Sequence, residues 1–235
     1  MTKWLIAGGC VGVVLAGLLL GWRWVSEPRP AEPYTPAPTA ADLEAIRAKA
    51  QLGDPQAQAE MGRFCENQPG GRERYAEAAK WFRQAAEQGN ADGQAGLAEL
   101  YETGQGVPKD VARALGLYRQ AAEHGHPGAQ YALGFDYETG RGAPQDQVQA
   151  AKWFRLAAEQ GQPLAQYDLG QRYTLGVGVA ADRCEALKWL MLAAAQGQPD
   201  AAAKRDPLKK TMTRSEIAQA RRLVDSFPRS HPGGR

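Results

Sequence analysis

Residues 129–161 read AQYALGFDYETGRGAPQDQVQAAKWFRLAAEQG, and this stretch decides the fold because its pattern returns at a fixed interval. Its last residue belongs to a set of glycines that are each 36 residues apart: Gly53, Gly89, Gly125, Gly161 and Gly197. Four units therefore follow one another in register without an insertion. Such a period is the signature of a repeat architecture.

Other positions of the unit keep their residue type from copy to copy. A glutamine, a large apolar residue, a small residue and an aromatic residue recur in the first half. In the third unit these are Gln130, Leu133, Gly134 and Tyr137, followed in the second half by Ala150, Trp153 and the pair Ala157-Ala158. We expect these regular columns to form the core.

Each unit reads as two helices joined by a turn. In the third unit Pro127 stands in the first turn of the first helix, where its missing N–H costs little. That helix runs to the turn Gly140-Arg141-Gly142. Asp146 then caps the second helix, with Gln149 at capping-box spacing. The second helix ends at Gly161, because glycine is the usual left-handed residue after a helix.

The pattern resembles the Sel-one-like repeat family, a relative of the tetratricopeptide repeats, through AQYALG at 129–134, YETGRG at 137–142 and AAKWFRLAAEQG at 150–161. Tetratricopeptide units are 34 residues long and lack the Gly-x-Gly turn. The resemblance implies an all-α, right-handed α/α solenoid of four 36-residue helix-pair repeats: 54–89, 90–125, 126–161 and 162–197. The first unit departs from the pattern, because Cys65 replaces the tyrosine and Gln68-Pro69-Gly70-Gly71 replaces the glycine turn.

Capping segments flank the repeats. Residues 42–53 have the register of a second helix and are predicted to form an N-terminal capping helix. Residues 198–226 are predicted to form a C-terminal cap, whose last helix opens at the capping box Thr213-Arg214-Ser215-Glu216. Such atypical ends protect the last core layer of a repeat array. We expect residues 227–235 to form a disordered tail.

The first 25 residues read as a transmembrane signal-anchor. No charged residue occurs from Trp4 to Trp22, and a helix of that length matches the ~30 Å core of a bilayer. A cleaved secretory signal is the alternative, but no small-x-small site follows the apolar run. The proline-rich segment 26–41 reads as a linker. Small residues such as Gly8, Gly12 and Ala16 share one face of the span, so a homodimer through it is a further possibility.

This anchor predicts a single-pass protein of the inner (plasma) membrane. The charges Lys3, Arg23 and Arg29 flank both ends, so they do not decide the orientation. The short segment before the span favours a repeat domain on the periplasmic side. A cytoplasm-facing adaptor is the alternative, and it predicts reduced Cys65 and Cys184.

A groove is predicted on the first helices of the units. At 100° per residue, the regular columns share one arc, and the residues opposite them vary between copies. The resemblance implies that first helices line the concave surface, so the variable residues face a groove. The predicted groove residues are Glu60, Arg63, Phe64, Glu99, Leu100, Phe135, Asp136, Asp168, Gln171 and Arg172.

Catalytic and metal-binding patterns were sought without success. No serine begins a Ser-x-x-Lys motif, which disfavours a penicillin-recognising enzyme. His124 occupies a glutamine column and His126 precedes Pro127 as a cap, so neither is predicted to bind a metal. The net charge of +2 predicts no nucleic-acid partner. We therefore expect no catalytic residues, no cofactor and no metal.

The sequence thus predicts a membrane-anchored, non-enzymatic scaffold or adaptor. It would present a concave groove to a protein or peptide partner in the cell envelope. The alternative is a cell-wall-directed hydrolase of the penicillin-recognising type, which the missing catalytic set disfavours. The resemblance supports the scaffold, because members of the family commonly assemble complexes.

Overall fold

The computed structural model describes residues 39–142 and 144–228. These residues form helices and turns without strands, so the all-α prediction is confirmed. The helices are α2 (Ala40–Gln51), α3 (Pro55–Asn67), α4 (Arg72–Glu87), α5 (Ala91–Thr103), α6 (Val111–Glu123), α7 (Pro127–Thr139), α8 (Gln147–Glu159), α9 (Pro163–Leu175), α10 (Arg183–Ala195), α11 (Pro199–Lys210) and α12 (Arg214–Asp225).

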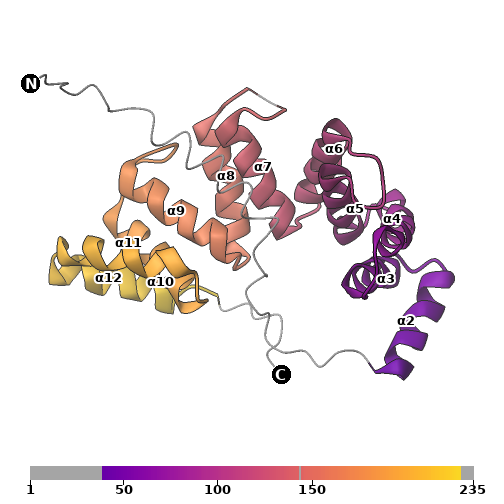
Figure 1. Cartoon of the computed structure of the whole chain (residues 1–235). Helices are drawn as coiled ribbons and strands as arrows, with labels where there is room; N and C mark the ends of the chain where they lie inside the picture. The colour runs from indigo at the N-terminus through magenta and orange to yellow at the C-terminus, as the bar shows by residue number, and fades with distance from the viewer. Residues whose placement is uncertain (1–38, 143, 229–235) are drawn as a thin grey trace, which may run out of the picture. The chain divides into compact units, whose positions relative to one another are not determined.

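Successive helix pairs build a solenoid of four repeats (Figure 1). Within the repeats α3 packs on α4, α5 on α6, α7 on α8 and α9 on α10. The second helix of each repeat also packs on the first helix of the next. The α2 helix covers α3, and both α11 and α12 contact α10. The predicted repeat order and capping helices are therefore the observed ones.

The helix ends follow the predicted chemistry. Asp146 accepts hydrogen bonds from the backbone N–H groups of Val148 and Gln149, at 2.9 and 3.0 Å, and so caps α8. The α7 helix ends at Gly140 in the left-handed conformation, with φ of 76°. Complete capping boxes open the two terminal caps, at Thr39 with Asp42 and at Thr213 with Glu216.

Glycines of the first helices lie against large buried side chains of the second helices. Phe82 of α4 is 1% exposed and lies against Gly62 of α3 and Gly96 of α5. A Cβ on either glycine would collide with its ring. Phe154 of α8 lies in the same way against Gly134 of α7. Small residues are therefore required where an aromatic ring separates the helices.

Buried glutamines join each repeat to its neighbours. Gln130 donates from Nε2 to the carbonyl of Ala122 in the preceding repeat, at 3.2 Å. Its Oε1 accepts from Nε2 of Gln160, which caps the end of its own repeat, at 2.7 Å. Gln58 and Gln166 make the same pair of bonds. These side chains are buried, and both the nitrogen and the oxygen of each amide are hydrogen-bonded, which is how a polar group is accommodated in a core.

The termini differ from prediction at two places. The α2 helix begins at Ala40 and not at residue 42, because Thr39 supplies the N-cap, so residues 40 and 41 are not linker. Phe227 was assigned to a disordered tail, but it packs edge-on against Trp189, with ring centroids 5.4 Å apart. Burial of two aromatic surfaces holds this residue against α10 of the fourth repeat.

The predicted location in the inner membrane is corrected. Among the residues that the structure describes, no helix is both long and apolar enough to cross a membrane. The predicted span, residues 1–25, and most of the predicted linker lie outside the described residues, as does the proposed homodimer contact through the span.

Candidate protein-binding surface

The variable residues of α3, α5, α7 and α9 are called here the first-helix face. Six of the ten predicted groove residues are half-buried on it: Glu60, Phe64, Glu99, Phe135, Asp168 and Gln171. Arg63 is exposed. These seven side chains keep surface that a partner can contact.

Three predicted groove residues are buried and do not line a surface. Leu100 is 0% exposed, Asp136 2% and Arg172 4%. They occupy equivalent positions in three successive repeats. A lone helix would leave this position open, but first helices also contact neighbouring repeats, as α3 does α5. Fewer positions of a first helix therefore face solvent than a spacing of 100° per residue predicts for one isolated helix.

Several variable residues bind one repeat to the next. Arg63 of the first repeat forms an ion pair with Asp92 of the second, with Nη2 2.7 Å from Oδ1. Gln56 approaches the same carboxylate at 3.4 Å, and His126 of the third repeat lies 3.4 Å from it. His126 also caps α7 by accepting from the N–H of Ala129 at 3.0 Å, as predicted. Burial lowers the pKa of His126, so its capping nitrogen stays available as an acceptor.

A second polar cluster joins repeats two and three. Arg141 donates from Nε to Oδ1 of the buried Asp136 at 2.7 Å, and its Nη1 binds Glu102 of the preceding repeat. Tyr118 donates its hydroxyl proton to Glu102 at 3.0 Å. Burial raises the pKa of Asp136 to about 6, although Arg141 opposes the rise. Its Oδ2 is buried without a partner among the described residues, which is consistent with that rise.

Repeats three and four are joined by a different pair. Arg172 donates from Nη2 to Glu138 at 2.6 Å and from Nη1 to Gln147 at 3.0 Å. Its guanidinium lies 4.8 Å from the ring centroid of Phe154. Arg172 thus stands where the previous repeat has Asp136, and each repeat boundary has its own polar contacts.

Tyr131 and Asp168 form a further contact across this boundary. The tyrosine hydroxyl donates to Oδ2 of Asp168 at 2.8 Å. Burial raises the pKa of Asp168 to about 7, against the opposing effects of Tyr131 and Arg172. Burial also raises the pKa of Tyr131 well above its ordinary value. Asp168 is therefore a carboxyl that changes charge near neutral pH.

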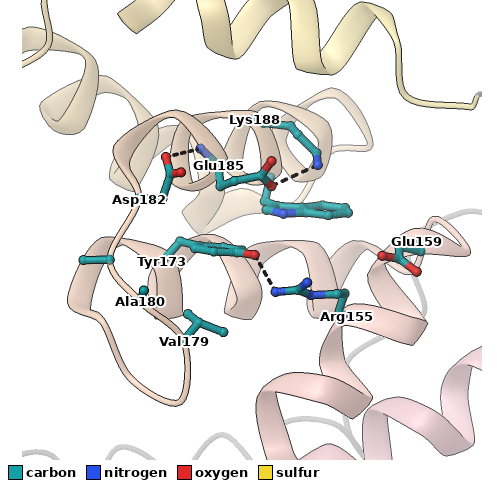
Figure 2. Close-up of a pocket in the computed structure, with 10 residues that line it drawn as sticks. Arg155, Glu159, Tyr173, Val179, Ala180, Asp182, Glu185 and Lys188 are labelled. Carbon is teal, nitrogen blue, oxygen red and sulfur yellow. Dashed lines mark hydrogen bonds and ion pairs between the residues drawn. The ribbon is translucent and has the colours of Figure 1, made fainter. Parts of the chain in front are cut away.

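Two adjoining hollows lie outside the first-helix face, in repeats three and four, and both are lined by Arg155 and Val179. The first, of about 500 Å³, is bounded by α8, α10 and the turn before α10 (Figure 2). Figure 2 shows Arg155 pointing toward the hydroxyl of Tyr173, to which it donates at 2.5 Å. Lys188 pairs with Glu185 at 3.0 Å. One ion pair and one arginine–tyrosine hydrogen bond therefore lie within this hollow.

The second hollow, of about 450 Å³, is more apolar. It is lined by one side of α8 and by Gly178 and Val179. Neither hollow was predicted, because the predicted binding residues lie on first helices alone. A detectable signal was present: Val148, Ala151, Lys152, Arg155 and Leu156 follow helical i, i+3, i+4 spacing on one side of α8.

The histidines and cysteines between residues 39 and 228 have structural surroundings. His124 takes the place of the capping glutamines, with Nδ1 2.9 Å from Oε1 of Gln94. Cys65 and Cys184 are free thiols, and burial raises the pKa of each. Raised pKa values leave little thiolate at neutral pH, so neither residue has the character of a nucleophile. Within the described ranges, no three His, Cys, Asp or Glu residues are grouped to hold a metal ion.

The comparisons agree with this architecture. The family model described as Sel1 repeat matches residues 55–90, 91–126, 127–162 and 163–198. The crystal structure of a Sel1 repeat protein from Oxalobacter formigenes is 35% identical, with a TM-score of 0.63 over 74% of this chain and 51% of that one. The structure of c5321, a protective antigen present in uropathogenic Escherichia coli strains and displaying an SLR fold, is 30% identical. Its TM-score is 0.54 over 79% of this chain and 48% of that one. This chain thus spans about half the length of each. No match is found among curated proteins.

Proposed function

Because this chain belongs to the Sel1 repeat family, whose members mediate protein–protein interactions and are typically not enzymes, we propose that it is a protein-binding scaffold. The first-helix face receives a segment of a partner protein. The role is one of positioning and assembly.

One observation carries this proposal. The regular columns largely keep their residue type from repeat to repeat, whereas the first-helix face differs between repeats and keeps seven predicted residues accessible. A surface with its own side chains at each repeat suits recognition of one particular partner, because specificity requires differences along the surface. Phe64 and Phe135 are half-buried aromatic residues on this face, and aromatic residues are enriched at protein interfaces.

Site-specific photo-crosslinking tests the proposal. A photoreactive amino acid replaces Phe135 or Gln171 in the full chain, and the same replacement at the exposed Glu123, on the second helix of repeat two, serves as the matched control. We expect a discrete adduct with the same partner from both first-helix positions and none from position 123. Equal labelling at all three positions, or labelling at position 123 alone, contradicts the proposal.

A further inference from the structure

The second hollow is an apolar groove on the outward side of α8. Its floor is the stripe Val148, Ala151, Lys152, Arg155 and Leu156, and one wall is Gly178 with Val179 from the next repeat. Val148 is 52% exposed and Leu156 43%. These are two of the six large apolar side chains that are exposed in the described part of the chain. Contiguous exposed apolar surface of this kind marks binding sites.

The same face of the next second helix shows what can cover such a stripe. On α10 the equivalent positions include Cys184 and Leu187, which are 8% and 0% exposed. They pack with Ile217, Ala220 and Leu223 of α12, together with Met212. An amphipathic helix of this chain therefore covers Cys184, whereas the equivalent Val148 of α8 is 52% exposed one repeat earlier.

The α8 groove is basic. Lys152 and Arg155 line the α8 groove, and none of its lining residues is acidic. Lys152 forms no ion pair with any residue that the structure describes. The α12 helix itself carries Arg214, Arg221 and Arg222, so a second copy of α12 would meet like charge. A helix with acidic flanks would instead meet opposite charge, which favours association.

We propose that the α8 groove binds an amphipathic helix of a partner protein, with apolar residues at i, i+3 and i+6 or i+7 and acidic residues beside them. This rests on the proposed function, to which it adds a second binding surface and the chemistry of its ligand. The apolar stripe of the ligand covers Val148, Leu156 and Val179, and its carboxylates pair with Lys152 and Arg155. The mode is that of a helix laid into an apolar groove.

The sequence of α12 supplies a probe. A labelled peptide of residues 213–226, with Arg214, Arg221 and Arg222 each changed to Glu, keeps the apolar side and carries acidic flanks. Titration with the full chain, followed by fluorescence anisotropy, measures its binding. We expect saturable binding that weakens with added salt, because the paired charges are exposed. The unchanged, basic peptide is the control for charge.

Variants locate the site. Leu156→Asp and Lys152→Glu are each expected to weaken binding of the acidic peptide by about tenfold or more. Lys80→Glu, at the equivalent position of the first repeat, is the matched control and leaves affinity unchanged. Circular dichroism checks that each variant is folded, and Lys152 is an exposed residue that tolerates substitution. A Phe135→Ala variant separates this test from that of the first-helix face, since it leaves peptide binding intact.

Three outcomes overturn the inference. The acidic peptide fails to bind, or binds equally to Leu156→Asp and Lys152→Glu, or the basic peptide binds at least as tightly. The last outcome assigns the groove to α12 of a second copy. None of these results bears on crosslinking at Phe135, so the proposed function is judged independently.

Discussion

Gly178 packs directly on Gln147, so that a Cβ added to the glycine would overlap the carbonyl oxygen of that residue in the preceding repeat. Gly178 also has a φ of 71°, in the left-handed region. Gly106 meets the backbone of Tyr75 and Ala76 in the same way. The two glycines of each Gly-x-Gly turn therefore have separate tasks. The first ends a helix, and the second lets the turn touch the repeat before it.

Substitution of Gly178 should cost much more stability than substitution of a glycine in open space. Gly161 has a φ of 89°, but an added Cβ there would meet nothing within 4 Å. Gly161→Ala should lower the free energy of unfolding by about 1 to 2 kcal/mol, the cost of a left-handed alanine. Gly178→Ala adds the backbone collision and should cost about 3 kcal/mol or more. Urea denaturation of both variants measures the difference, and equal losses would show that φ alone selects glycine here.

Replacement of a buried glutamine should lower the free energy of unfolding, because each glutamine hydrogen-bonds to other groups. Gln130→Leu removes one hydrogen bond from the carbonyl of Ala122 and one from the side chain of Gln160, although each keeps a bond to the backbone of Gly125. We expect a loss of about 2 kcal/mol in unfolding free energy, because two hydrogen bonds of about 1 kcal/mol each are lost. Gln120→Leu, at an exposed position, is the control and should change stability by less than about 0.5 kcal/mol. Thermal unfolding followed by circular dichroism checks both, and a tolerated Gln130→Leu would refute the bridging role.

Replacement of Arg172 and replacement of Glu138 should lower the free energy of unfolding by different amounts. The side chain of Arg172 is 5% exposed and that of Glu138 40%. Glu138→Ala leaves a buried guanidinium without its carboxylate and should cost about 3 kcal/mol. Arg172→Met leaves an exposed carboxylate that water solvates, so we expect about 1 kcal/mol. Denaturation curves for both variants decide the matter, and the reverse order would mean that the arginine acts mainly through packing on Phe154.

Titration of two buried carboxyls should lower the free energy of unfolding as the pH rises from about 4 to 7. Burial raises the pKa values of Asp136 and Asp168 to about 6 and about 7, from an ordinary value of 3.8. The folded state therefore binds more protons than the unfolded state between about pH 4 and 7, and the free energy of unfolding falls as pH increases across that window. We expect Asp168→Asn to be more stable than the native chain at pH 8 by about 1 to 2 kcal/mol, and close to it at pH 5.

Tyr131→Phe provides the counter-test for that pH dependence. The tyrosine hydroxyl lowers the pKa of Asp168 against the effect of burial, so its removal should move the transition to higher pH. Unfolding free energies at several pH values between 5 and 8 measure both variants. A pH profile unaltered by Asp168→Asn would mean that this carboxyl does not titrate in the window.

Much of the fold was predictable because a repeat presents the same evidence four times. Proline at first turns, capping aspartates and glycine ends each recur at one spacing, so the helix boundaries were accurate to one or two residues. The prediction of the core residues was less accurate. The sequence drew attention to the column of Trp153, which is only half-buried, whereas its neighbour Phe154 is 0% exposed and fills the space between helices. Adjacent large apolar residues do not reveal which one faces inward.

The candidate surface was predictable only in part. Exposure on a first helix depends on how neighbouring repeats approach it, and no single-helix period contains that information. Asp136 and Arg172 therefore read as surface residues although partners in adjacent repeats bury them. The α8 groove depends on which second helix a terminal cap covers. The α12 helix packs on α10, and the sequence does not specify which second helix it covers.

The glutamine bridges bear on how such an array can change its length. Gln130, for example, bonds to a carbonyl of the preceding unit eight residues earlier and to Gln160 at the end of its own unit 30 residues later, so both hydrogen bonds depend on fixed spacings within the repeat. Duplication or deletion of a whole unit preserves every bridge, since the incoming glutamine finds an equivalent carbonyl. Insertion of a single residue within a unit would displace one end of a bridge. Evolution can therefore lengthen or shorten this protein readily in whole units, while changes of partial units are selected against.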